Sequence, residues 1–86
     1  MNRMKKQTTA SIKNSLKMDM RGIGLRIRGL RGEIRQQAFA SELGISQSQL
    51  SKIESGNVSP TIEFVLRLAS KFRTSIDWIV TGKGCQ

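Results

Sequence analysis

The sequence of 86 residues contains no His, no Tyr, one Pro and a single Cys, Cys85. One Cys excludes an internal disulfide, and without His the chain has too few ligands for a structural zinc ion. We interpret Cys85 as an incidental free thiol. An acid–base pair would have to come from six acidic residues scattered over separate predicted helices. The sequence therefore predicts that the protein is not an enzyme and has no metal or cofactor.

Long hydrophobic runs are also missing. No apolar run approaches the roughly 18 residues that cross a bilayer. Lys5 and Lys6 are followed by no apolar stretch of the kind found in signal peptides. The length suits one small domain. We therefore expect a cytoplasmic protein with no membrane partner.

Positive charge is what the sequence has in excess. Fifteen Lys and Arg residues stand against six Asp and Glu, which gives a net charge of +9. In so short a chain this excess favours a polyanionic partner, either nucleic acid or anionic lipid. The alternative is a protein that is merely basic.

Residues 1–21 are polar and basic and contain neither Gly nor Pro. Ile12, Leu16 and Met20 predict a weak amphipathic helix over 11–20, although three apolar residues cannot hold a helix alone. A mobile tail and a basic arm that contacts phosphates both remain open. A membrane-surface helix is disfavoured, because the apolar face is narrow and has no aromatic residue.

The next segment has four residues at the spacing of a buried helical face: Ile23, Ile27, Leu30 and Ile34. We predict a helix over 23–31 that ends at Gly32. Gly22, Gly24 and Gly29 do not form a nucleotide loop, because no strand precedes them and no Lys-Ser/Thr pair follows.

Two helices then surround a short turn. The first is predicted over 36–43, and its inward face consists of Phe39, Ala40 and Leu43. The turn is Gly44-Ile45-Ser46, in which Ser46 can cap the next helix. That helix is predicted over 47–55, with Leu50 and Ile53 inward.

Two further helices follow the loop at Pro60. Thr61 is the predicted cap of a helix that ends at Phe72, and its predicted inward residues are Ile62, Val65, Leu66, Ala69 and Phe72. Ser75 caps a fifth helix, with Asp77 at its positive end. The sequence shows no strand alternation and no repeat, so it predicts an all-α fold of five short helices.

Two helices joined by a Gly-containing turn form a helix-turn-helix. The segment QQAFASELGISQSQLSKIES is similar to that motif in the phage repressor and Cro family, also called XRE-type. The matching residues are Gln36, Phe39-Ala40, Leu43-Gly44-Ile45, Leu50 and Ile53, followed by IESGNVSP. The resemblance implies a five-helix, lambda-repressor-like domain over 22–82. Residues 1–21 would be a basic N-terminal extension, and 83–86 a C-terminal tail.

The resemblance implies that the helix over 47–55 reads DNA bases. Its short polar side chains permit close approach in a major groove about 12 Å wide, and the Gln amide suits adenine. The implied base contacts are Gln47, Ser48, Ser51 and Lys52. The alternative for these residues is a solvated polar face.

A second set of residues is expected to contact phosphates, which position the protein rather than read the sequence. These residues are Arg35, Gln36, Gln49, Ser55, Asn57 and Ser59. Gln36 stands at a helix N-terminus, where an anion is favoured. Arg35 replaces the usual capping Ser or Thr, at a cost of about 1 kcal/mol. The resemblance also implies a structural salt bridge between Arg31 and Glu54.

The resemblance thus implies a sequence-specific DNA-binding transcriptional regulator, repressor-like, acting as a homodimer on a palindromic operator. Two recognition helices would lie about 34 Å apart. Trp78, Ile79 and Val80 are candidate dimer contacts, although Trp78 also suits the monomer core. A phage repressor, a restriction–modification controller and an antitoxin remain open. A protein-interaction module that has lost DNA binding is disfavoured by the charge of +9. The sequence identifies no toxin or polymerase partner.

Overall fold

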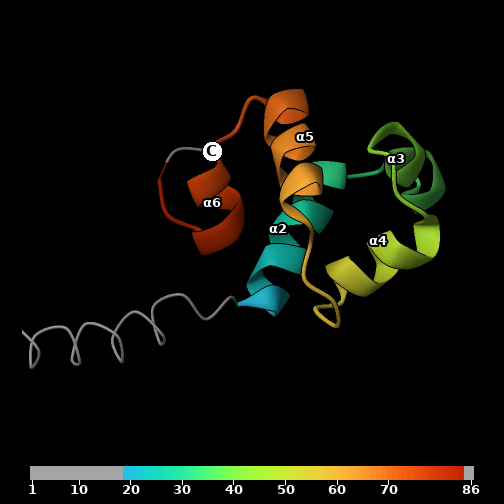
Figure 1. The fold of residues 1–86 in the computed structure, drawn as a ribbon, viewed down its shortest axis with the longest axis horizontal. Helices are drawn as coiled ribbons and strands as arrows, with labels where there is room; N and C mark the ends of the chain where they lie inside the picture. Colours follow the sequence, from blue (N-terminus) through green and yellow to red (C-terminus); the bar gives the residue numbers. More distant parts are fainter. Residues whose placement is uncertain (1–18, 85–86) are drawn as a thin grey trace, which may run out of the picture.

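The computed structural model describes residues 19–84, which contain five α-helices and no strand. The helices are α2 (Met20–Arg31), α3 (Gln36–Glu42), α4 (Gln47–Glu54), α5 (Ile62–Phe72) and α6 (Ile76–Thr81). Figure 1 shows α2 at the centre, with α3 and α4 on one side and α6 on the other. The predicted all-α fold is confirmed. The weak helix expected over 11–20 lies outside the described residues except for its last two positions, and Cys85 lies outside them as well.

Side-chain caps begin three of the predicted helices. Ser46, Thr61 and Ser75 each accept a hydrogen bond from the backbone N–H three residues later, at 3.0–3.1 Å. These caps satisfy N–H groups that the first helical turn leaves without partners. Arg35 precedes α3 and makes no side-chain cap, as its chemistry requires.

The beginning of α2 differs from the prediction. Asp19 accepts a hydrogen bond from the Gly22 backbone N–H at 3.1 Å, and the helix begins at Met20 rather than Ile23. Met20 and Arg21, which the sequence assigned to the N-terminal extension, therefore form the first turn of α2. The sequence analysis missed Asp19 as a cap.

The core gathers apolar side chains from all five helices and the turn after α3. Its buried members are Ile23, Ile27, Phe39, Ala40, Leu43, Leu50, Ile53, Phe64, Val65, Leu68 and Ile79. The rings of Phe39 and Phe72 join α3 to α5, with centroids 5.8 Å apart. No helix in residues 19–84 has the length and apolar character to cross a membrane.

Three apolar residues predicted to face inward are exposed. Ile34 follows the end of α2 and does not continue its buried stripe. On α5, Ile62 is 80 % exposed and Leu66 is 49 % exposed, while Phe64 and Leu68 are buried instead. Seven of the eleven residues of α5 are apolar, so their spacing fits more than one inward face. Packing against the rest of the core selects the face that is buried.

A close contact brings α2 against the end of α4. A Cβ on Gly24 would lie 2.3 Å from the Glu54 carbonyl oxygen and 2.7 Å from that of Ile53. Only a residue without a side chain fits so close to another backbone. Gly24 therefore permits the distance at which α4 crosses α2.

Gly24 and Gly29 provide a matched pair of substitutions within one helix. Gly24→Ala should lower the free energy of unfolding by about 1–3 kcal/mol, the usual cost of overpacking. Gly29→Ala should raise it by roughly 0.5–1 kcal/mol, because a Cβ there meets no atom within 4 Å. Urea denaturation of both variants measures the difference. Equal effects of the two substitutions would contradict the close contact at Gly24.

Candidate nucleic-acid interface

The turn between α3 and α4 sets the geometry of the helix-turn-helix. Leu43 ends α3, and Gly44 adopts a left-handed conformation with φ of 76°. Ser46 then caps α4 by accepting from the Gln49 backbone N–H at 3.1 Å. Arg67 on α5 donates to the Leu43 carbonyl oxygen at 3.1 Å. The Ser46 cap thus fixes the end of the turn, and the hydrogen bond from Arg67 fixes its beginning to α5.

The second helix of the motif, α4, has one buried side and one polar side. Leu50, Ile53 and Glu54 face the interior. The exposed side carries Gln47, Ser48, Gln49, Ser51 and Lys52. Within the described part of the chain, these five side chains make no hydrogen bond or ion pair. They form a contiguous set of donors and acceptors that face solvent, as required for contacts to base edges.

The predicted phosphate residues lie at both ends of the helix-turn-helix. Arg35 is exposed at the start of α3, and Asn57 and Ser59 are exposed in the loop after α4. Ser55 is also exposed, but its hydroxyl donates to the Lys52 carbonyl oxygen at 3.0 Å. The Ser55 oxygen keeps its acceptor capacity, whereas its proton is already in use.

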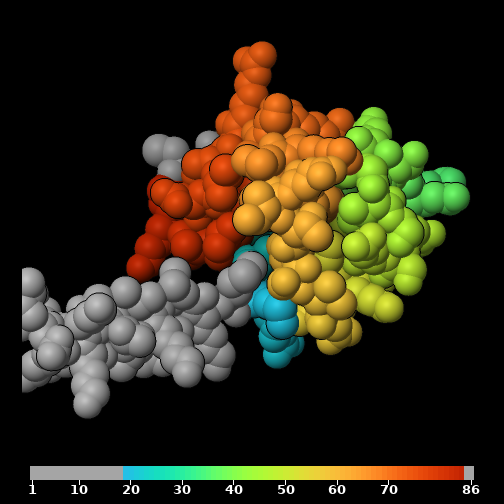
Figure 2. Space-filling model, in the orientation of Figure 1, coloured from blue at the N-terminus to red at the C-terminus, as the bar shows by residue number. Residues whose placement is uncertain are grey.

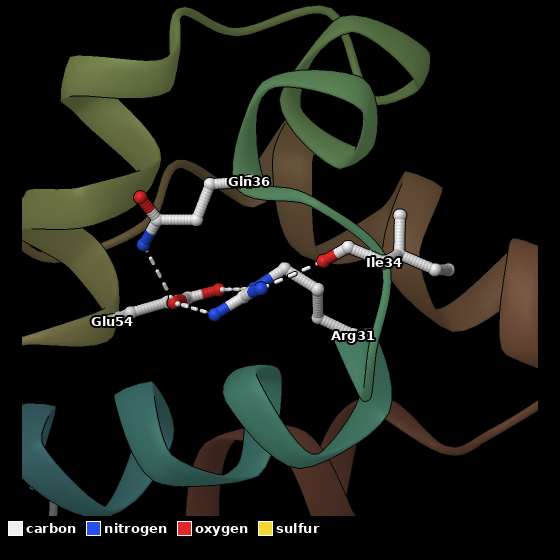
Figure 3. A network of polar contacts seen from close by, with 4 residues as sticks. All are labelled: Arg31, Ile34, Gln36 and Glu54. Carbon is white, nitrogen blue, oxygen red and sulfur yellow. Dashed lines mark hydrogen bonds and ion pairs between the residues drawn. The ribbon is translucent and has the colours of Figure 1, made fainter.

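A buried polar network joins α2, α3 and α4 (Figure 3). Arg31 Nε donates to Glu54 Oε2 at 2.7 Å, and Arg31 Nη2 donates to Glu54 Oε1 at 3.0 Å. Arg31 Nη1 also donates to the Ile34 carbonyl oxygen at 2.7 Å. The expected pair of Arg31 and Glu54 is therefore present, in a two-pronged geometry that fixes orientation as well as distance.

The same network includes Gln36, which the sequence assigned to phosphate binding. Its Nε2 donates to Glu54 Oε1 at 3.0 Å. Figure 3 shows the Gln36 side chain directed toward Glu54. One of its two amide N–H groups is thus used within the protein, and the other N–H, the amide oxygen and the backbone N–H are left for other partners. Sequence spacing could not show this, because Glu54 lies 18 residues away.

Arg31 keeps its positive charge over the accessible pH range. The hydrogen bond to Glu54 raises the pKa of Arg31; burial opposes this change and the negative charge of Glu54 adds to it. A cation with a raised pKa contributes its full stability below its ordinary pKa, and this stability is lost only as the pH rises through the folded-state value. For arginine that loss lies far above neutral pH.

Other arginines have structural partners that the sequence analysis left unassigned. Arg26 on α2 donates from Nε to the Ile79 carbonyl oxygen at 2.8 Å and from Nη2 to that of Val80 at 3.1 Å. Arg26 therefore holds the end of α6 against α2. Its role could not be read from the sequence, because the two segments are more than 50 positions apart.

Comparison with known proteins agrees with this geometry. A family model described as helix-turn-helix matches residues 26–79. A crystal structure of the P22 c2 repressor protein in complex with synthetic operator 9T superimposes with a TM-score of 0.65 and 32 % sequence identity. The alignment covers 71 % of this chain and 96 % of that repressor chain. A comparison with curated protein sequences gave no match.

Arg31→Ala tests whether the network supports the fold. The Glu54 side chain is 5 % exposed, so removing its cationic partner leaves a buried charge unpaired. We expect the free energy of unfolding to fall by about 3 kcal/mol. Glu63→Gln is the control, because it breaks the exposed pair with Arg67, whose contribution is under about 1 kcal/mol. Thermal denaturation compares the two variants. Similar losses in the free energy of unfolding would show that the buried network stabilises the fold no more than an exposed ion pair does.

Proposed function

We propose that this chain, which belongs to the helix-turn-helix family and is a DNA-binding transcriptional regulator, acts as a repressor-like homodimer on a palindromic operator. One observation carries the proposal. The exposed side of α4 is a continuous set of short polar side chains without partners among the described residues, on a helix whose other side is fixed in the core.

In the proposed complex, α4 enters the major groove and reads base edges. Gln47 and Ser48 belong to its first turn and Ser51 and Lys52 to its second, so they follow one another along the exposed side. A Gln amide can bond both N6 and N7 of adenine, and Lys can donate to guanine. Short Ser side chains leave room for the backbone of α4 to approach the bases.

Phosphate contacts from both sides of α4 would hold the helix in register. Arg35 and Gln36 approach from the start of α3, and Asn57 and Ser59 from the loop after α4. Gln49 and Ser55 complete the proposed set. Because Gln36 Nε2 is bound to Glu54, we assign its phosphate contact to the backbone N–H at the helix start. Occupancy of the operator would then exclude other proteins from the same DNA.

The proposed dimer explains how a protein with only one short DNA-reading helix per subunit could select a single operator. A two-fold symmetric protein matches a palindrome whose half-sites lie about one helical turn apart. On α6, Ile79 is fully buried within the monomer and cannot contact a partner. Ile76 is 44 % exposed and Trp78 is half-buried, so they are the contacts that we propose for the dimer.

The base-reading role is tested with Gln47→Ala. Preferred sites are selected from random DNA, and binding to them is measured at several salt concentrations. The variant should show a base preference that is weaker by roughly 1–3 kcal/mol at one position of the site. Gln49→Ala is the matched control from the same helix and should leave that preference intact. Arg35→Ala, which removes a side chain that we assign to phosphate, should weaken binding to all sequences alike. Weak, sequence-independent binding that disappears near 200 mM salt would refute base reading by α4.

The dimer is tested with Ile76→Lys. A charge at this exposed position should change the free energy of unfolding by less than about 0.5 kcal/mol. It should also disfavour an apolar contact between copies. We expect operator binding to become less steep with protein concentration, and affinity for the full palindrome to approach that for a half-site. A quantitative gel-shift titration measures both quantities, and unchanged steepness would rule out this face.

A further inference from the structure

The last helix, α6, depends on contacts from outside itself. It has only six residues, too few to be stable as an isolated helix. Ile79 is its one buried residue, and Trp78 is half-buried. A hollow of about 420 Å³ opens between α2 and α6, and its lining residues are Gly22, Leu25, Arg26, Gly29, Leu30 and Trp78. Apolar packing therefore holds this edge of α6 only in part.

Arg26 supplies polar contacts at the C-terminal end of α6, where the last carbonyl groups of a helix have no partners within it. The Gly82 N–H donates to the Trp78 carbonyl oxygen at 2.8 Å. Arg26 donates to the next two carbonyl oxygens, those of Ile79 and Val80, at 2.8 and 3.1 Å. The guanidinium holds both because its N–H donors lie in one rigid plane, and its charge suits the negative end of the helix dipole. Arg26 thus fixes both the position and the direction of α6 on α2.

The helix that Arg26 holds also carries the proposed contacts between subunits, Ile76 and Trp78. Figure 2 shows the residues of α6, in red, on the opposite side of the molecule from the green residues of α3. In Figure 1, α2 lies between α6 and the two helices of the helix-turn-helix. A rotation of α6 on α2 would therefore move the proposed dimer contacts and leave α4 in place.

We propose that Arg26 is a positioning residue for the dimer. By fixing α6 on α2, it holds Ile76 and Trp78 in the orientation in which two copies present α4 to successive turns of the major groove. This inference rests on the proposed function. The two copies of α4 must lie about 34 Å apart to read both half-sites at once, so the direction of α6 at the two-fold axis decides whether both can bind. In this arrangement Arg26 contacts neither DNA nor the partner subunit.

Three single substitutions in the full chain separate this role from a general effect of charge. Arg26→Ala removes both hydrogen bonds and one positive charge. Arg26→Lys keeps the charge but replaces the planar fork with a single ammonium group. Arg28→Ala is the matched control, because Arg28 lies on the same helix, is exposed, and makes no hydrogen bond or ion pair within residues 19–84. It removes the same charge without releasing α6.

Binding is measured at low salt on two duplexes, one with the full selected palindrome and one with a single half-site. Arg26→Ala should bind the full palindrome about ten-fold or more weakly than Arg28→Ala does, the factor that corresponds to two hydrogen bonds of ordinary strength. The two variants should bind the half-site equally, because α4 and the phosphate residues are unchanged. Arg26→Lys should be intermediate on the full palindrome and should match the wild type on the half-site.

The fluorescence of Trp78 reports the position of α6 directly, because Trp78 is the one Trp of the chain. Arg26→Ala should make Trp78 of the free protein easier to quench with acrylamide. Arg26→Lys should do so to a smaller extent, and Arg28→Ala should have no effect. Far-ultraviolet circular dichroism checks that the other helices stay folded, and Arg26→Lys carries the test if Arg26→Ala does not fold.

The proposal is overturned if Arg26→Ala binds both duplexes as Arg28→Ala does and Arg26→Lys binds both as the wild type does. Equal losses on the full palindrome and the half-site would also overturn it, because Arg26 would then support the whole fold rather than the dimer contacts. A wild-type chain that binds the full palindrome no more tightly than the half-site would instead refute the proposed homodimer.

Discussion

The contact between α2 and the C-terminal end of α4 is the constraint on which the rest of the structure depends. Two features hold it: Gly24, which lets the two backbones meet, and the Glu54 carboxylate, which receives two N–H groups of Arg31 and one of Gln36. Burial of a carboxylate is costly unless its oxygens are satisfied and its charge is paired, and this network does both. Because Gln36 begins α3, the same carboxylate fixes both helices of the motif to α2.

This constraint allows α4 to carry a surface that contributes little to its own stability. Ser and Gln on an exposed helix face are weaker choices than Ala, Glu or Lys, and α4 is only eight residues long. Such a helix is stable because its cap at Ser46, its buried face and Glu54 are held by the rest of the domain. Its outer residues are therefore free to be selected for contacts with DNA.

The cationic residues differ in whether they have partners within the fold. The described arginines that contact neighbouring elements, such as Arg26 and Arg31, are part of the fold. The exposed cations of residues 19–84 that have no such partner include Arg21, Arg35 and Lys52 near the helix-turn-helix, together with Arg28, Arg73 and Lys83. Salt-dependent attraction to phosphates would orient the domain, and the polar face of α4 would then discriminate between sequences. The likeness to a repressor crystallised with an operator agrees with this arrangement.

Local patterns were sufficient for the fold class, the helix order, the turn at Gly44 and the caps at Ser46, Thr61 and Ser75. These features depend on residues close together in the chain. The inward face of α5 was predicted correctly at Val65, Ala69 and Phe72 but wrongly at Ile62 and Leu66, because seven of its eleven residues are apolar and only packing against the neighbouring helices selects one face. The binding of Gln36 to Glu54 and that of Arg26 to the end of α6 likewise came only from the packed structure. Both contacts join residues far apart in the chain, and the periodicity of a sequence cannot reveal contacts of this kind.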